Sequence, residues 1–218
     1  MTQNHHAVEG REIVYRSDDD ALCDNCAENS NTLQMDPSLL RPAVSAADIG
    51  PSGYTRVWFD EHIGDMIEAH GKARAPDRCS QWHHIVGVAG EVAVGAWQGV
   101  PMDRRILPDY EGDDGFDLLA PDRYRDRPLR IEVKATQDRW NPEQMVNSDK
   151  IDCADRFVLC ATGAPREYVD IVGYTSRPLL KIIGKTYGRD GFLLTPEHLH
   201  PTGADYVSPD EVREVMYG

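Results

Sequence analysis

Residues 112–136 read GDDGFDLLAPDRYRDRPLRIEVKAT, and this stretch decides the fold. Two short apolar runs flank a loop rich in Pro, Asp and Arg, a pattern that predicts a β-hairpin. In the second run, Ile131 and Val133 alternate with Glu132 and Lys134. Because successive side chains of a strand point to opposite faces, we expect Glu132 and Lys134 to lie side by side on one face.

An aspartate on the partner strand adds a second carboxylate to this face. Asp117 is flanked by apolar residues, as a ligand at a strand end would be, whereas the nearby alternatives Asp113 and Asp114 fit a turn better. Hard cations such as Mg²⁺ prefer oxygen ligands, and a lysine beside the ion can orient a water molecule or offset charge on a phosphate. Grouped carboxylates repel one another, so without metal one of Asp117 and Glu132 should have a raised pKa.

The arrangement Asp-x(n)-Glu-x-Lys across a hairpin resembles the PD-(D/E)xK nuclease superfamily, which has the restriction-endonuclease-like fold. Phe116 stands before the aspartate, where many members carry proline. The resemblance implies that Asp117 and Glu132 hold one or two Mg²⁺ (or Mn²⁺) ions, with the Val133 carbonyl as a further ligand. Lys134 would orient the nucleophile or neutralise charge. The alternative is a salt-bridged Glu–Lys pair on a solvated strand face.

A second acid is expected at the site because of its place on a helix. The residues from Ser80 to Gln98 predict a mostly apolar helix, and Glu91 is its single acid. Burying a lone carboxylate is costly, so Glu91 should be paired, metal-bound or at a cleft edge. Gly-x-x-Gly-Glu on a helix before the hairpin resembles the N-terminal-helix glutamate of many superfamily members, which contributes to the metal site. The alternative is a glutamate on the narrow polar face of the helix.

The remaining elements complete an expected α/β fold. A helix is predicted from Tyr54, with Gly71 just after its end, and another from Ser208 to Met216. Apolar runs predict strands at 155–161 and 168–174. We expect a mixed central β-sheet of about four or five strands with helices on both faces, that is, a restriction-endonuclease-like core.

The first part of the chain is expected to be a separate appendage. Pro, Gly, Asn and Ser interrupt residues 1–53, so we predict a partly irregular segment there and a nuclease-like domain at 54–218. Cys23 and Cys26 form a Cys-x-x-Cys motif that could supply half of a zinc site. A structural zinc site needs four ligands and the sequence has no second such motif, so we favour a turn without metal over zinc.

Composition and charge limit the compartment and the partners. The chain has 218 residues, 40% of them hydrophobic and 28% charged, with no apolar run of membrane-spanning length and no signal peptide at its start. We therefore expect a cytoplasmic protein with no membrane partner. The net charge of −14 opposes nucleic-acid binding, but a local basic cleft and bound Mg²⁺ can outweigh it. Lys150 could contact a substrate phosphate, with a solvated lysine as the alternative.

The predicted function is Mg²⁺-dependent hydrolysis of DNA phosphodiester bonds. Three alternatives remain open. One is a Holliday junction resolvase, which has the same constellation and works as a homodimer. Another is a domain of the same fold that binds nucleic acid or a protein without cutting. The third is an interaction protein built around zinc at the N-terminal cysteine pair.

Overall fold

A computed structural model describes residues 53–75, 80–102, 115–122, 126–183, 185–187, 191–203 and 205–218. The predicted cysteine motif at Cys23 and Cys26 lies outside the described residues, and so do Asp113 and Asp114. The predicted boundary between appendage and domain, after residue 53, stays a prediction.

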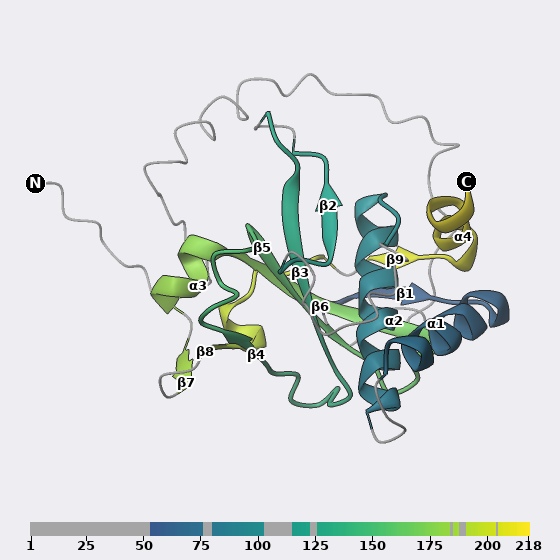
Figure 1. The fold of residues 1–218 in the computed structure, drawn as a ribbon, viewed down its shortest axis with the longest axis horizontal. Helices are drawn as coiled ribbons and strands as arrows, with labels where there is room; N and C mark the ends of the chain where they lie inside the picture. The colour runs from purple at the N-terminus through teal and green to yellow at the C-terminus, as the bar shows by residue number, and fades with distance from the viewer. Residues whose placement is uncertain are drawn as a thin grey trace, which may run out of the picture. The chain divides into compact units, whose positions relative to one another are not determined.

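A curled mixed sheet lies at the centre of the described part of the chain (Figure 1). Its six strands follow the order β2-β3-β5-β6-β1-β9. The pairs β3–β5 and β1–β9 are parallel, and the other neighbours are antiparallel. The strand bounds are β1 (Thr55–Trp58), β2 (Leu118–Ala120), β3 (Leu129–Thr136), β5 (Arg156–Ala161), β6 (Tyr168–Ser176) and β9 (Tyr206–Val207).

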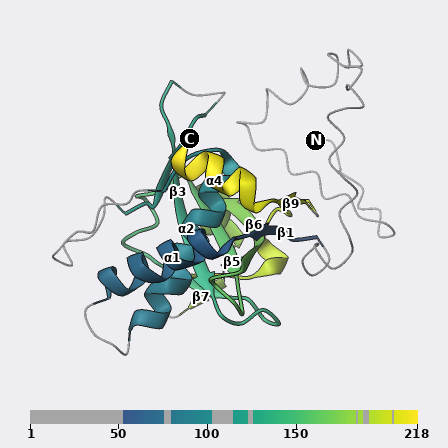
Figure 2. The same cartoon turned by 90° about the vertical axis from the view of Figure 1, so that its right-hand side faces the viewer.

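One face of this sheet is covered by three helices, α1 (Glu61–Arg74), α2 (Gln81–Gln98) and α4 (Pro209–Tyr217) (Figure 2). Helix α2 lies directly on the sheet and contacts five of its strands, while α1 and α4 pack against α2. The core between them is aliphatic and includes Val92 of α2 and Ile131 of β3, both fully buried. Helix α2 therefore runs past the β2–β3 hairpin.

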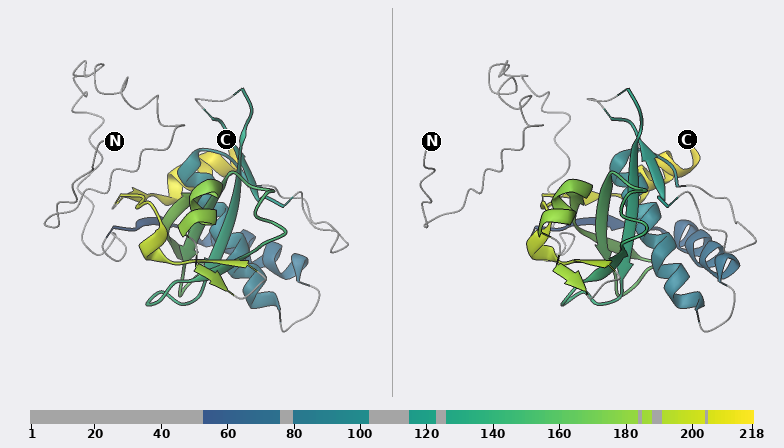
Figure 3. Two further views of the ribbon diagram at one scale, coloured as in Figure 1. Left: turned by 90° about the vertical axis from the view of Figure 1, so that its left-hand side faces the viewer. Right: turned by 60° about the vertical axis from the view of Figure 1, so that its left-hand side comes forward.

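The opposite face is covered by α3 (Arg177–Ile183) and by a separate antiparallel sheet (Figure 3). A second core joins Phe157 and Leu159 of β5 to Leu180 of α3. Because β5 is buried on both faces, its sequence is a continuous apolar run rather than an alternating one. The small sheet has the order β4-β8-β7, with β4 (Gln144–Asn147), β7 (Lys185–Tyr187) and β8 (Gly191–Leu194), and a short 3-10 helix follows at Pro196–His198.

Several predicted elements are confirmed, and the residues that start or end two of the helices can be identified. The hairpin exists as β2 and β3, paired antiparallel, and the mixed sheet is flanked by helices on both faces. Helix α2 starts after Ser80 and ends at Gly99, whose φ of 69° lies in the left-handed region that glycine adopts readily. At α4, Ser208 and Glu211 form a capping box.

The helix predicted from Tyr54 is wrong in its first part. Residues 55–58 form β1, which pairs with β6 on one side and β9 on the other. The helix begins only at Glu61, because the Asp60 side chain caps it by accepting the Ile63 N–H at 2.9 Å. Gly71 does not end this helix. It lies inside α1, where a side-chain carbon would come within 2.6 Å of Cα of Ile85.

The sheet is also larger than predicted, with six strands in the described residues rather than four or five. The prediction missed β4, α3, β7 and β8 altogether. These four elements are short, so none of them gives a strong periodic signal in the sequence. In β4, for example, only Val146 is fully buried. Among the described residues, no helix is both long enough and apolar enough to cross a lipid bilayer.

Candidate functional site

Two hydrogen bonds tie Asp117 to β3. The Asp117 N–H donates to the Ile131 carbonyl at 2.8 Å, and the Asp117 carboxylate accepts the Val133 N–H at 2.6 Å. Asp117 immediately precedes β2, so the register of the hairpin sets the position of its side chain. Its carboxylate therefore lies against the β3 backbone between Glu132 and Lys134.

Glu132 and Lys134 lie on one face of β3, as the alternation predicts, because Lys134 Nζ forms an ion pair with Glu132 Oε1. Glu132 is only 3% exposed. Its second oxygen, Oε2, is buried and has no hydrogen-bond partner among the residues that the structure describes. A buried carboxylate oxygen left in this state is costly, and such atoms commonly mark a place for an ion or a water molecule.

Helix α2 brings Glu91 to the same place. Glu91 is 9% exposed and interacts electrostatically with Asp117. Its approach depends on Gly90, where a side-chain carbon would lie 3.0 Å from Cβ of Ala135 on β3. The glycine therefore allows the helix to pass close to the strand that carries the Glu-x-Lys pair.

Arg74 is a member of the site that sequence reasoning missed. Its Nη1 donates to both oxygens of Glu91, at 2.7 and 2.9 Å. Arg74 is the last residue of α1 and lies far from Glu91 in the sequence, so their meeting depends on how α1 and α2 cross. A basic residue in the last turn of a helix is common, and nothing in the sequence links it to this acid.

The electrostatics of the cluster show an excess of negative charge. The pKa of Asp117 is raised well above its usual value, first by burial and then by the charges of Glu91 and Glu132. The hydrogen bond from Val133 and the charge of Lys134 act in the opposite direction but do not offset this. The expectation that one of the grouped carboxylates has a raised pKa is confirmed.

The donor set fits a hard divalent cation in its chemistry. Glu91, Asp117 and Glu132 offer only oxygens, which suit Mg²⁺ or Mn²⁺. Within the described residues, no three His, Cys, Asp or Glu side chains stand together as a ready-made metal site. The carboxylates instead accept from Arg74, from Val133 and from the lysine, and side-chain rotation would be needed to turn their oxygens to one ion. The unpartnered Glu132 Oε2 is the atom best placed to receive it.

Lys150 lies in a turn near the segment that leads to Asp117, and its contact with a substrate phosphate stays a prediction. It belongs to the turn after β4, where its N–H donates to Asn147 at 3.1 Å and its carbonyl accepts from Cys153 at 3.0 Å. Cys153 in turn lies against Gly115, because a side-chain carbon at that glycine would meet Cys153 Sγ at 2.7 Å. The turn that carries Lys150 thus borders the segment leading to Asp117.

The loop end of the β2–β3 hairpin is held by a separate set of ion pairs around Asp155. Arg127 donates to both Asp155 oxygens at 2.7 Å, and the Arg130 N–H donates to one of them at 3.1 Å. These bonds hold the pKa of Asp155 far below its usual range, with the Arg127 side-chain hydrogen bond as the largest cause. They fix β3 to the start of β5, beside the cluster.

Comparison with protein-family models, with curated proteins and with solved structures finds no match for this chain. The chemistry of the site is therefore inferred from the residues of the chain itself. The site contains three carboxylates, of Glu91, Asp117 and Glu132, with Lys134 and Arg74 beside them.

Proposed function

We propose that the chain is a Mg²⁺- or Mn²⁺-dependent deoxyribonuclease that hydrolyses phosphodiester bonds of DNA. One observation carries the proposal: Glu132 Oε2 is buried without a partner, next to Asp117, whose pKa is raised by burial and by neighbouring acids. Lys134 lies beside both groups. Grouped acids of this kind would suit a divalent cation, and the partly exposed ammonium of Lys134 would suit an anionic substrate.

Asp117, Glu132, Glu91 and the carbonyl of Val133 would hold the ion. A divalent cation bound there would lower the pKa of a water molecule and polarise a phosphoryl oxygen. The Val133 N–H fixes one oxygen of Asp117 before any ligand arrives, and rotation of the Glu91 and Glu132 side chains would complete the ion site. Fixed positioning of the kind seen at Asp117 is what electrostatic stabilisation of a transition state requires.

Lys134 would act on the substrate directly. Its side chain is about a quarter exposed, so the ammonium can reach a phosphate outside the cluster while it stays paired with Glu132. There it can donate to a non-bridging oxygen as negative charge develops, or orient the attacking water molecule. Arg74 would act as a positioning residue, because it holds both oxygens of Glu91 and keeps that carboxylate turned toward the cluster.

The order of elements supports the restriction-endonuclease-like assignment. The helix that carries Glu91 comes first, the β2–β3 hairpin second, and the parallel neighbour β5 third. This is the order that the resemblance to the PD-(D/E)xK superfamily implies. With a net charge of −14, DNA binding would depend on local cations, and we propose Lys150 as a phosphate contact in addition to Lys134.

A substrate panel tests the proposal. The chain is incubated with linear, nicked, flapped, single-stranded and four-way DNA in Mg²⁺, in Mn²⁺ and in EDTA, beside the variant Glu132→Gln. We expect metal-dependent cleavage by the wild type only. Cleavage of the four-way substrate alone would favour the resolvase and its homodimer. Binding without cleavage in either metal would contradict the enzyme and favour a binding domain.

A further inference from the structure

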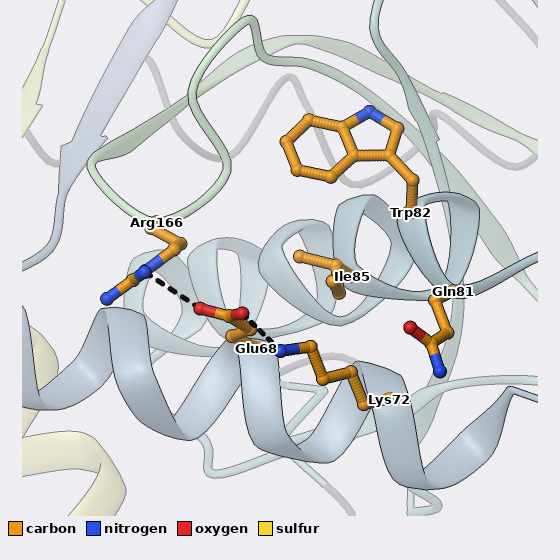
Figure 4. Close-up of a pocket in the computed structure, with 6 residues that line it drawn as sticks. All are labelled: Glu68, Lys72, Gln81, Trp82, Ile85 and Arg166. Carbon is orange, nitrogen blue, oxygen red and sulfur yellow. Dashed lines mark hydrogen bonds and ion pairs between the residues drawn. The ribbon is translucent and has the colours of Figure 1, made fainter. Parts of the chain in front are cut away.

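A pocket of about 370 Å³ lies between α1, the first turns of α2 and the turn that joins β5 to β6 (Figure 4). Its volume falls within the usual range of small-ligand sites, roughly 300–1,000 Å³. Six residues line it: Glu68, Lys72, Gln81, Trp82, Ile85 and Arg166. The carboxylates of the proposed catalytic cluster are not among them, so this is a separate site on the same helix.

The upper wall of the pocket in Figure 4 is an aromatic ring. Trp82 is 45% exposed, whereas Ile85 below it is almost fully buried and forms an apolar floor. The indole is therefore accessible to a ligand in the pocket. An exposed tryptophan at a concave site offers a large stacking area for a planar ligand.

The opposite wall carries two cations, Lys72 and Arg166, that are joined by the carboxylate of Glu68. Lys72 Nζ and Arg166 Nη1 bind different oxygens of Glu68, the latter at 2.8 Å (Figure 4). The hydrogen bond from Lys72 lowers the pKa of Glu68, so the acid stays ionised and keeps both cations in position. Arg166 also pairs with Asp65 through Nη2, so the two cations are matched by two acids, Glu68 and Asp65. Both cationic side chains are about half exposed, so an anion in the pocket can reach them.

We propose that this pocket binds a nucleobase with its adjoining phosphate, supplied by an unpaired nucleotide of a DNA strand. The base stacks on Trp82 above Ile85, the amide of Gln81 faces the base edge, and the phosphate pairs with Lys72 and Arg166. A simple anion would leave the indole unused, and an apolar ligand would leave the cations unused. The choice of DNA rests on the proposed function, whereas the stacking site itself rests on the pocket.

Quenching of tryptophan fluorescence by an oligothymidylate tests this subsite in EDTA, where no cleavage can occur. We expect the wild type to be quenched and Trp82→Phe to lose most of the quenching. Trp82→Ala should bind about tenfold more weakly, the usual effect of losing one stacked base. Trp140→Phe is the matched control, because Trp140 is 96% exposed on a loop outside the pocket, and it should keep the quenching.

The cations are tested by the salt dependence of the same binding. Lys72→Gln and Arg166→Gln should each reduce the slope of log K against log salt by about 0.7, the value for one phosphate contact of a single strand. Glu68→Gln removes a competing acid and should strengthen binding.

Thymidine monophosphate in place of the oligonucleotide distinguishes a free nucleotide from a DNA strand as the source of the ligand. Trp82-dependent binding of both identifies a mononucleotide site, and binding of the oligonucleotide alone identifies a strand site.

Equal affinity and equal quenching in the wild type and in Trp82→Ala would overturn the subsite, even if the chain cuts DNA. Trp82-dependent quenching would support the subsite even if no cleavage is found with any metal. The failure of the nuclease proposal and the failure of the subsite are therefore separate results.

Discussion

The backbone N–H of Val133 donates to the carboxylate of Asp117 at 2.6 Å, and this bond fixes the aspartate between Glu132 and Lys134. Because the donor belongs to the strand itself, the arrangement does not depend on flexible side chains. The hairpin that the sequence pattern predicts is thus also the frame of the candidate site. Its carboxylates are close enough to repel one another when no cation is bound.

Asp117→Asn should stabilise the protein in EDTA at neutral and alkaline pH. The pKa of Asp117 is raised in the folded state, so its ionisation costs stability as pH rises above the unfolded value of about 3.9. The asparagine has no charge to bury and can still accept the Val133 N–H. Thermal unfolding at pH 8 should show a gain of at least about 2 °C, the effect of roughly 1 kcal/mol in a chain of this size. Below pH 4 the difference should disappear.

The wild type and Asp117→Asn also test whether a metal ion binds at the carboxylate cluster. Millimolar Mn²⁺ should raise the unfolding temperature of the wild type, because a ligand that binds only the folded state stabilises it, by about 2.7 kcal/mol at a hundred times Kd. Asp117→Asn should show a much smaller rise. An equal rise in both proteins would place the bound metal elsewhere, and no rise in either would speak against a metal site at this cluster.

Arg74→Ala should lower both stability and activity, because it removes the cation that binds both oxygens of the buried Glu91. We expect a loss on the order of 1–3 kcal/mol in the free energy of unfolding, since the pair is partly exposed. Glu91→Gln in the same protein should restore much of the stability but not the cleavage rate. Denaturant unfolding and cleavage rates of the two variants separate these effects. Full activity of the folded Arg74→Ala protein would contradict a positioning role.

Two glycines of α2 form a matched pair for testing how closely the helix must approach β3. At Gly87 nothing lies within 4 Å of an added side-chain carbon, whereas at Gly90 such a carbon meets Ala135 at 3.0 Å and Val133 at 3.2 Å. Gly87→Ala should stabilise by about 0.5–1 kcal/mol through helix propensity. Gly90→Ala should destabilise by about 1 kcal/mol, since overpacking exceeds that gain, and should weaken Mn²⁺ binding by displacing Glu91. Equal effects of the two substitutions would contradict the close approach.

Local patterns explain what the sequence could and could not predict. The hairpin pattern and the apolar run of α2 each lie within a short stretch of sequence, so the hairpin, the helix and four of the site residues could be predicted: Asp117, Glu132, Lys134 and Glu91. Strand β1 could not, because its stability comes from pairing with β6 and β9, more than a hundred residues later. Arg74 could not either, because only the crossing of two helices brings it to Glu91.

Asp155 gives a pH dependence of the opposite sign. Its pKa is lowered in the folded state by Arg127 and Arg130, so its contribution to stability is fully present above the unfolded pKa of about 3.9 and is lost as pH falls below that value. Asp155→Asn should therefore destabilise at pH 7, by on the order of 1–2 kcal/mol because Arg127 is half exposed. The difference between the unfolding curves of the two proteins should shrink steadily as the pH falls below about 3.9. A difference that is constant with pH would exclude the ion pairs as its cause.

The most direct test of the nuclease assignment is the cleavage rate of Lys134→Ala in Mg²⁺ or Mn²⁺, measured under single-turnover conditions. Lys134 is not packed in the core, so its truncation should leave a folded, metal-binding protein. Loss of its ammonium should reduce the rate by on the order of a hundredfold or more. Lys150→Ala is the control, and it should at most weaken DNA binding in a salt-dependent way. Cleavage by Lys134→Ala at the wild-type rate would contradict the assignment of this hairpin as a nuclease site.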